Sequence, residues 1–373
     1  MGVVSMPDLR TVKRLLIIRL SSIGDVVHAL PVSAALGEAF PNLEITWLVE
    51  AMSADIVTGN PYLKEVIIAP RQSRKESGLG SIRVWKEYGA FLGDLRRRKF
   101  DVTLDLQGRA KSGVMAYATG ATYRFGWSGL REGSEIASKR LPRRPESQHR
   151  VDWFLDVARA FGANPEVVKF PLFIPDAAQA KVRELLRQNG VDPEKPYAVL
   201  NAATGNQVRR WGAERFAETS VELRRKYDLP CVLIGSVKDA ALNQEIIALA
   251  SNHENRNDVS PVDLAGKTNL KELAALLDGC AVHISGDTGS GHLAAALNVP
   301  VVGLYGPTDP ARAGPYGQLA NVLAHREICG VNCSGKGCGY AQDGGEMARC
   351  LAAIETNNVT WKVEKILRHG TTR

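Results

Sequence analysis

The sequence predicts an α/β protein with two doubly wound parallel sheets, and two observations carry that prediction. Short apolar runs of strand length alternate with longer helical patterns along most of the 373 residues, which favours parallel sheets covered by helices. The second half then begins as the first does, with a strand, a turn of small residues and a helix, at 15–36 and again at 197–218. A chain of this length can form two full cores, and we expect domains at 1–174 and 175–358.

The individual elements follow from local patterns. The expected strands of the first domain are Leu15–Ile18, Ile45–Val49, Val66–Ala69, Val102–Leu106 and Tyr123–Trp127, with helices at Val32–Phe40, Val84–Lys99 and Val151–Phe161. Prolines at both ends of PLFIP indicate an extended linker at Phe170–Pro175. The second domain is expected to contain a helix at Ala177–Asn189, strands at Tyr197–Asn201, Cys231–Ile234, Val262–Ala265, Ala281–Ser285 and Val299–Leu304, and a last helix at Val359–His369.

Basic residues are concentrated in one region of the first half. Residues 71–150 carry a net charge of +10, whereas the remainder of the chain sums to −3. Such a region indicates a polyanionic partner, whether nucleic acid, anionic lipid or a phosphorylated glycolipid, although the run at 96–99 is better explained as a solvated helix end. No apolar run reaches the roughly 20 residues of a membrane span or forms a signal-peptide core, so we expect a cytoplasmic protein.

Four of the six cysteines cluster late in the chain, at Cys329, Cys333, Cys338 and Cys350. Four thiolates can hold a tetrahedral zinc ion, but these spacings are not those of a standard finger or ribbon. Free thiols are the alternative in a reducing cytosol.

The segment at 284–317, ISGDTGSGHLAAALNVPVVGLYGPTDPARAGPYG, predicts an anion site. We expect a buried strand, a glycine-rich turn carrying Asp287 and Thr288, and a helix that opens near His292. Glycine lets the backbone approach a ligand closely, and a helix N-terminus offers N–H groups to an anion. The sequence therefore predicts a phosphate or pyrophosphate site, with an ordinary strand–turn–helix connection as the alternative.

The segment at 15–36, LLIIRLSSIGDVVHALPVSAAL, has the same strand–turn–helix form. Asp25 lies in its turn and is the candidate general base. From the residues alone, the alternative is that Asp25 caps a helix starting at Val26, because Asp is a favoured N-cap. His28, one turn later, is interpreted as a core histidine.

Five segments together resemble the ADP-heptose lipopolysaccharide heptosyltransferases, glycosyltransferase family nine, and most of all its type I enzymes. They are SSIGDVVHALP (21–31), ITWLVE (45–50), LDLQGRAKSG (104–113), GDTGSGHLAAAL (286–297) and YGPTDPARAGPYG (305–317). The resemblance implies the GT-B architecture, in which two Rossmann-like domains face a cleft and the final segment, 359–373, returns to the first domain. It implies inverting transfer of heptose from ADP-L-glycero-D-manno-heptose to the Kdo-lipid A inner core of lipopolysaccharide, at the inner-membrane surface and without a cofactor.

The resemblance also assigns roles to donor-side residues. Asp25 matches the family's proposed base, while the turn at Asp287, Thr288 and Gly289 and the following His292 match its contacts to diphosphate and sugar; helix capping is the alternative for His292. In the segment NAATGNQVRRW, Thr204 and Arg209 occupy donor positions, and an arginine offers a planar bidentate phosphate contact. Ala203 stands where some relatives have a second threonine. Asp239, in LIGSVKDAAL, matches an acidic residue that meets the adenosine ribose.

The acceptor side is less specific. Arg71, Arg74 and Lys75 resemble the family's basic acceptor loop, and Gln107, Lys111 and Arg131 are similar candidates. The inner core of lipid A is heavily anionic, which suits a segment of net charge +10.

Several other classes of function are excluded or disfavoured. No Asp-x-Asp pair occurs, which favours a metal-independent mechanism with Arg209 and a helix N-terminus in place of the cation. No G-x-G-x-x-G suggests a nicotinamide dehydrogenase, and GVNCSGKG at 330–337 lacks the Ser or Thr and the context of a phosphate loop. A related transferase with another donor or acceptor, of the heptosyltransferase II or III type, and a basic nucleic-acid-binding protein remain alternatives, although no motif supports a nucleic-acid partner.

Overall fold

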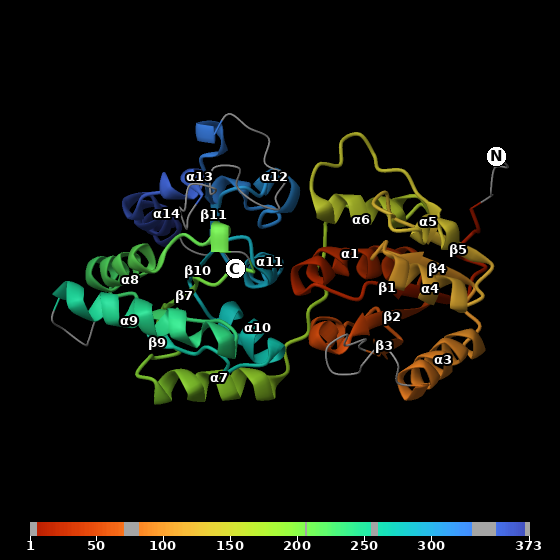
Figure 1. Ribbon diagram of the computed structural model, residues 1–373, viewed down its shortest axis with the longest axis horizontal. Helices are drawn as coiled ribbons and strands as arrows, with labels where there is room; N and C mark the ends of the chain where they lie inside the picture. Colours follow the sequence, from red (N-terminus) through yellow and green to blue (C-terminus); the bar gives the residue numbers. More distant parts are fainter. Residues whose placement is uncertain (1–5, 71–81, 206, 255–259, 330–347, 370–373) are drawn as a thin grey trace. The chain divides into compact units, whose positions relative to one another are not determined.

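The chain folds as two compact units, Met1–Phe173 and Ile174–Arg373. The computed structural model describes residues 6–70, 82–205, 207–254, 260–329 and 348–369 (Figure 1). Each unit is a six-stranded sheet whose strands are all parallel. The predicted α/β fold class with two doubly wound sheets is therefore confirmed.

The first unit alternates strands with helices, as its apolar runs predict. Its strands are β1 (Arg14–Ile18), β2 (Glu44–Glu50), β3 (Glu65–Ala69), β4 (Val102–Asp105), β5 (Tyr123–Gly126) and β6 (Lys139–Arg140). Its helices are α1 (Ile23–Ala39), α2 (Ala54–Val57), α3 (Ile82–Arg97), α4 (Ala110–Ala118), α5 (Ser134–Ala137) and α6 (Arg150–Arg159).

The strand order of the first sheet is β3-β2-β1-β4-β5-β6. The chain therefore leaves β1 in one direction to build β2 and β3, and then crosses back to build β4, β5 and β6. Right-handed crossovers consequently place α1 on one face of the sheet and α3, α4 and α5 on the other, and α6 packs on α1. The point where the order reverses lies between β1 and β4, whose last residues, Ile18 and Asp105, pair in register.

The second unit repeats this plan. Its strands are β7 (Ala198–Asn201), β8 (Cys231–Leu233), β9 (Val262–Asp263), β10 (Val282–Ser285), β11 (Val301–Tyr305) and β12 (Val322–Ala324). Its helices are α7 (Asp176–Gln188), α8 (Ala213–Tyr227), α9 (Ala240–Glu254), α10 (Leu270–Asp278), α11 (Gly289–Ala296), α12 (Pro310–Ala313), α13 (Arg349–Ala352) and α14 (Thr356–His369). The order β12-β11-β10-β7-β8-β9 reverses between β7 and β10, where Asn201 and Ser285 pair.

The last helix packs within the second unit. Helix α14 lies against α8 and β11 of that unit, and the return of residues 359–373 to the first domain stays a prediction. Val359 and Val363 on α14 are fully buried in that unit's hydrophobic core, with Ile366 and Leu367 packed beside them. This apolar stripe at helical spacing explains the placement, because burying it requires an apolar partner, which the second unit supplies.

Helix α1 is longer than the predicted Val32–Phe40. It begins at Ile23 and runs through Pro31. Proline normally disrupts a helix interior, but residues 26–36 are all buried, and tertiary packing of this kind outweighs local propensity. Asp25 is thus the third helical residue and Ser22 the N-cap, so the interpretation of Asp25 as an N-cap is wrong.

A buried histidine supports the turn between β10 and α11. The Nδ1 atom of His283 lies 2.9 Å from the carbonyl oxygen of Val199, and its Nε2 atom lies 3.1 Å from the Oγ of Ser290. A carbonyl oxygen can only accept, so Nδ1 carries the proton and the neutral ring accepts at Nε2. Complete burial lowers the pKa of His283 to about 4, although the hydrogen bond to Val199 opposes that shift.

The first prediction concerns acid stability. The unfolded chain protonates His283 near pH 6.5 and the folded chain only near pH 4, so folding stability falls as the pH falls between these values. Between pH 7 and pH 5 the loss should be about 2 kcal/mol in the free energy of unfolding. A His283→Gln variant should show a shallower pH dependence in denaturant titrations, whereas equal slopes for both proteins would mean that His283 is already charged when folded.

Candidate functional site

The first candidate site lies at the reversal point between β1 and β4, where ligands bind in open α/β sheets. The turns that follow these strands are joined by one side chain. The Oε1 atom of Gln107 accepts hydrogen bonds from the backbone N–H groups of Leu20, at 3.0 Å, and Ser21, at 3.2 Å. Gln107, predicted to contact the acceptor, thus braces the turn that leads from β1 into α1, the helix that carries Asp25.

Asp25 is held between two arginines. Its Oδ2 lies 2.8 Å from Nη2 of Arg19, and its Oδ1 lies 2.7 Å from Nη1 of Arg150, the first residue of α6. Ser22 donates a further hydrogen bond to Oδ2, at 3.2 Å. Arg19 is only 4% exposed, whereas the Asp25 side chain keeps 24% of its surface exposed. The carboxylate is therefore fixed in orientation and still accessible.

The arginines determine the protonation state of Asp25. Burial favours the neutral acid, but the charges of Arg19 and then Arg150 outweigh that effect, and hydrogen bonds from Arg150 and Ser22 add to them. The result is a pKa below the ordinary aspartate value. Asp25 is consequently ionised at neutral pH, as a base must be before it takes a proton, although the same arginines weaken it as a base.

A second carboxyl group, Asp105, organises the turn after β4. It is fully buried at the end of that strand and accepts hydrogen bonds from the N–H groups of Gln107 and Gly108 and from the hydroxyl of Ser112. Burial raises its pKa to about 6, and the hydrogen bonds oppose that rise only in part. Asp105 thus fixes the turn that presents Gln107.

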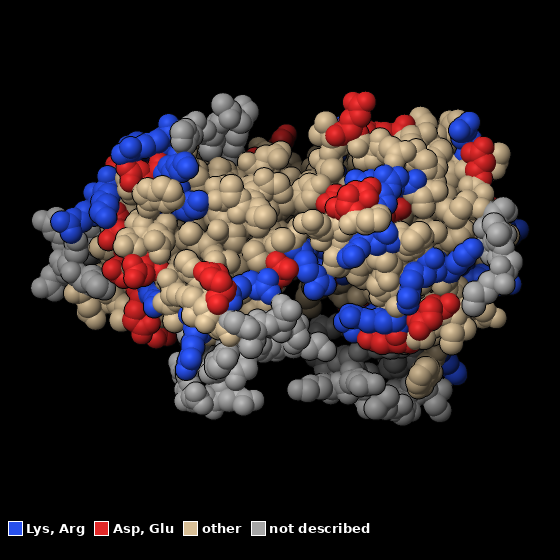
Figure 2. All heavy atoms as spheres, turned by 90° about the horizontal axis from the view of Figure 1, so that it is seen from above, with Lys and Arg blue, Asp and Glu red and all other residues tan. Residues whose placement is uncertain are grey.

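Of the other predicted acceptor residues, the structure describes Lys111 and Arg131. Lys111 pairs with Glu50 through an Nζ–Oε1 distance of 2.8 Å, and Arg131 is 60% exposed with Glu132 at 3.9 Å. Arg71, Arg74 and Lys75 lie outside the described residues. On the face shown in Figure 2, Lys and Arg side chains lie among Asp and Glu, so much of the basic charge has acidic neighbours.

The second candidate site lies at the reversal point of the other sheet. Asp287, in the turn after β10, accepts from Nη1 of Arg209 at 2.9 Å and from the hydroxyl of Thr308 at 2.8 Å, both on Oδ2. Nε2 of His292 lies 3.6 Å from Oδ1. Arg209 follows β7 in a 3₁₀ turn (Gln207–Arg209) and Thr308 follows β11, so Asp287 joins segments that follow three adjacent strands.

The charge state of Asp287 follows from these partners. Burial favours its neutral form, but His292, Thr308 and Arg209 together hold its pKa below the ordinary value. The ionised Asp287 orients Arg209, which keeps 27% of its side-chain surface exposed. The arrangement suits a cation that is positioned to receive an anion.

Thr288 is the N-cap of α11. Its Oγ1 accepts from the N–H of Gly291 at 3.4 Å and lies 2.9 Å from the Oγ of Ser290. Gly289 is the first residue of the helix. His292 is buried at 7% exposure beside Asp287 and does not cap the helix, so the capping alternative for this residue is wrong.

Thr204 and Asp239 are positioned less specifically. A Cβ atom on Gly286 would lie 3.3 Å from Cγ2 of Thr204, so the absence of a side chain there lets Thr204 approach the turn before Asp287. Asp239 follows β8 in a 3₁₀ turn, and its Oδ2 accepts from the N–H and hydroxyl of Ser236, at 2.8 and 2.6 Å. A local cap thus already occupies one oxygen of Asp239.

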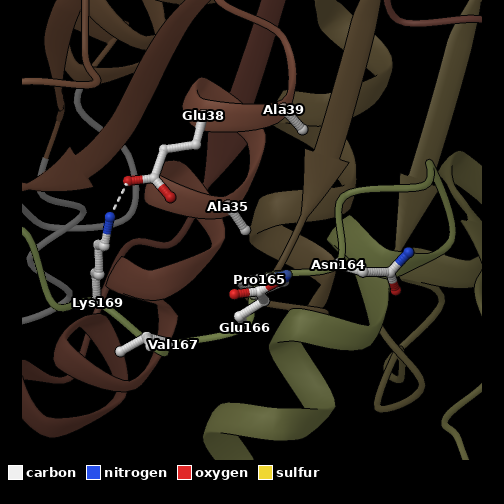
Figure 3. A pocket seen from close by; sticks show the side chains of 8 residues that line it. All are labelled: Ala35, Glu38, Ala39, Asn164, Pro165, Glu166, Val167 and Lys169. Carbon is white, nitrogen blue, oxygen red and sulfur yellow. Dashed lines mark hydrogen bonds and ion pairs between the residues drawn. The ribbon is translucent and has the colours of Figure 1, made fainter.

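A cavity in the first unit lies apart from the Asp25 site. This cavity, of about 400 Å³, is bordered by the end of α1 and residues 164–169, with Glu38 paired to Lys169 at its edge (Figure 3). Glu38 is thirteen residues beyond Asp25, or about 20 Å along the helix, so this cavity is separate from the Asp25 site. It contains none of the predicted site residues.

The cysteine cluster is described only in part. Cys350 is buried in the core of the second unit and Cys329 packs against that core. Cys333 and Cys338 lie outside the described residues. Within the described ranges, no three His, Cys, Asp or Glu side chains are grouped so as to hold a metal ion. The four-cysteine zinc site stays a prediction.

The sequence did not reveal three residues of the first site. Arg19, Arg150 and Asp105 surround the Asp25 turn, yet none was predicted. Arg19 could have been noticed, because a charged residue directly after the apolar run LLII must find a partner if it is buried. Arg150 had no local signal, since it lies 125 residues from Asp25.

The chain is similar in sequence to proteins of known function. The model of glycosyltransferase family 9 (heptosyltransferase) matches residues 89–340. The chain is 30% identical over 341 residues to lipopolysaccharide heptosyltransferase 1 of Pseudomonas aeruginosa, covering 88% of each. It is 27% identical to the lipopolysaccharide core heptosyltransferase OpsX of Haemophilus influenzae, covering 84% of each, and 27% identical to lipooligosaccharide heptosyltransferase 2 of that organism, covering 88% of this chain and 94% of the relative.

Solved structures support the fold. ADP-heptose lps heptosyltransferase II of E. coli matches 95% of this chain and 99% of its own with a TM-score of 0.75 and 22% identity. E. coli heptosyltransferase WaaC with ADP covers the same shares, with a TM-score of 0.68 and 24% identity. The predicted pair of Rossmann-like domains is thus the fold of known GT-B heptosyltransferases.

Proposed function

Since this chain belongs to glycosyltransferase family 9, and is therefore a glycosyltransferase of the heptosyltransferase type, we propose that it transfers heptose from ADP-L-glycero-D-manno-heptose to the Kdo-lipid A inner core of lipopolysaccharide. The observation that carries the proposal is the Arg209–Asp287 ion pair at the reversal point of the second sheet. A guanidinium there, beside the N-terminus of α11, suits a departing diphosphate, whose charge must be stabilised as it leaves.

The proposed roles of the residues divide between the two candidate sites. Arg209, Thr204, Thr288, Gly289 and His292 bind the diphosphate and sugar, Asp287 orients Arg209, and Asp239 meets the ribose. Asp25 takes the proton from the acceptor hydroxyl, which attacks the anomeric carbon from the face opposite ADP and inverts the configuration. No cofactor is needed, and we propose that no divalent metal is needed either, because the sequence has no Asp-x-Asp pair.

The acceptor side of the proposal depends on charge. Arg71, Arg74, Lys75, Gln107, Lys111 and Arg131 are the proposed acceptor contacts. An anionic acceptor group that pairs with Arg150 would compete with Asp25 for that guanidinium, and the pKa of Asp25 would then rise. The base would gain strength once the acceptor is bound. The reaction is proposed to take place in the cytoplasm, at the inner-membrane surface.

A second candidate is addition of a later heptose of the core. The relatives include enzymes named heptosyltransferase 1 and heptosyltransferase 2. The two candidates share a donor and differ only in the acceptor.

The proposed function is tested by turnover with defined substrates. Purified protein should release ADP from ADP-heptose only when a Kdo-lipid A acceptor is present, and EDTA should leave the rate unchanged. An acceptor that already carries the first heptose should serve poorly, and efficient use of it would favour the second candidate. Full loss of activity on chelation, or equal turnover with UDP-glucose, would contradict the proposal.

The role of Asp25 is tested by Asp25→Asn. We expect turnover to fall by about 10² or more, the usual scale for a positioned base. The substitution should also lower stability, because Arg19 would keep a buried charge without its carboxylate partner. Folding must therefore be verified by thermal melting, and the affinity for ADP should be unchanged. Glu38→Gln, which removes another ion-paired carboxylate from α1, is the matched control, and near-wild-type turnover of Asp25→Asn would remove Asp25 from the mechanism.

The position of the diphosphate is tested by Arg209→Ala and Thr288→Ala. Each removes a hydrogen bond to charge, so ADP affinity measured by calorimetry should fall about ten- to a hundredfold. Thr288→Ala also removes an N-cap, worth about 1 kcal/mol, so Thr288→Ser serves as the variant that keeps the hydroxyl. Arg225→Ala, an exposed arginine on α8, is the charge control. Unchanged affinity in both alanine variants would mean that the diphosphate binds elsewhere.

A further inference from the structure

An unusual set of apolar side chains is exposed on α4 and α5 of the first unit. Val114 and Tyr117 on α4 are 49% and 67% exposed, and Ile136 on α5 is 90% exposed. Residues three apart lie on the same side of a helix, and Ser112, Gly113, Met115 and Ala116 on the other side of α4 are buried. None of these exposed residues is used by the proposed reaction.

The two helices form one continuous surface. A Cβ atom on Gly113 would lie 2.9 Å from the Cα of Ser134, so the missing side chain lets α5 pack directly on α4, and Figure 1 shows the two helices side by side. Arg124 connects their exposed residues. Its guanidinium carbon lies 5.6 Å from the centre of the Tyr117 ring, and its Nε donates to the carbonyl of Ala137 at 2.9 Å. Ile136 directly precedes Ala137 in the chain. The exposed side chains of Val114, Tyr117 and Ile136, together with Arg124, are here called the α4–α5 face.

The charge around the α4–α5 face is strongly positive. Residues 109–144 contain eight Lys and Arg against two acidic residues, Glu132 and Glu135. Two of the cations are paired, Arg109 with Glu132 and Lys111 with Glu50. Lys139 and Arg140, which follow α5, are exposed. A net positive charge persists after these pairings, so the complementary partner is anionic.

The size of the apolar set indicates which anionic partner fits. A stable protein interface needs about 800 Å² on each side with a packed apolar centre, and three separate side chains do not provide one. Aromatic and aliphatic side chains surrounded by Lys and Arg are instead typical of surfaces that lie in the headgroup layer of an anionic bilayer. The cations contact lipid phosphates, while the apolar side chains leave water.

We propose that the α4–α5 face is the surface by which this protein docks on an anionic lipid bilayer, with Val114, Tyr117 and Ile136 entering the headgroup layer. The inference rests on the proposed function only in that a lipid-anchored acceptor gives the enzyme a reason to dock. The docking itself requires neither donor nor acceptor.

The test uses the full chain and vesicles without substrates. The wild type should co-sediment with vesicles of phosphatidylethanolamine and phosphatidylglycerol, and much less with phosphatidylcholine alone. The double variant Tyr117→Ser, Ile136→Ser should lose about tenfold or more in vesicle affinity, since two inserted side chains are removed. Both residues are exposed, so its melting temperature should match the wild type.

The matched control is Trp361→Ser in the second unit. Trp361 is 56% exposed on α14 and, like Tyr117, lies beside cations, Lys362 and Lys365. This variant should bind vesicles as the wild type does. Undiminished binding by the double variant, equal loss in the control, or equal binding to phosphatidylcholine would each overturn the proposal.

A second measurement separates this inference from the proposed function. The double variant should transfer heptose normally to a water-soluble acceptor fragment and more slowly to acceptor embedded in vesicles. A wild type that binds anionic vesicles through this face but transfers no heptose would support docking while refuting the proposed function. Loss of transfer to the soluble fragment in the double variant would refute docking as the role of these residues, since they would then serve the reaction itself.

Discussion

The buried guanidinium of Arg19 is the constraint on which the first unit's site depends. A cation that is 4% exposed is tolerated only with a carboxylate partner and hydrogen bonds, and Asp25 together with the Leu106 carbonyl supplies them. The requirement draws the first turn of α1 against the end of β1. Arg150 then draws the start of α6 to the same carboxylate. One charge cluster thereby sets the position, orientation and ionisation of Asp25.

In the second unit the charges have the opposite arrangement. There a carboxylate, Asp287, is the partly buried group, and Arg209, Thr308 and His292 converge on it from three segments. The strand order is the same in both sheets, so each cluster forms where crossovers diverge and the carboxyl ends of strands leave room for a ligand. The first cluster leaves a carboxylate accessible, which suits proton transfer. The second leaves a guanidinium and a helix N-terminus accessible, which suits an anion.

The sequence predicted what depends on neighbouring residues and missed what depends on distant ones. The predicted strands and the turn after β10 that carries Asp287 and Thr288 follow from local apolar runs and small residues, and each is present. The capping alternative for Asp25 placed the start of this helix at Val26; α1 begins three residues earlier, at Ile23, and runs through Pro31 because packing of its buried turns outweighs the local penalty. Arg150 was missed for a related reason: its partner Asp25 lies 125 residues away along the chain, and a single sequence carries no signal for such a contact. Asp105 has no local signal either, because its role depends on its complete burial at the end of β4.

The most direct test of this description is an NMR titration of the Asp25 carboxyl carbon in the wild type and in Arg150→Gln. The wild-type carboxyl should titrate below the ordinary aspartate range, because Arg19 and Arg150 stabilise its charge. Removing the Arg150 charge should raise that pKa, while Arg19 keeps the carboxylate in place. An Asp25 pKa at or above the ordinary value in the wild type, or one that does not move in Arg150→Gln, would contradict the view that paired arginines hold this carboxylate ionised.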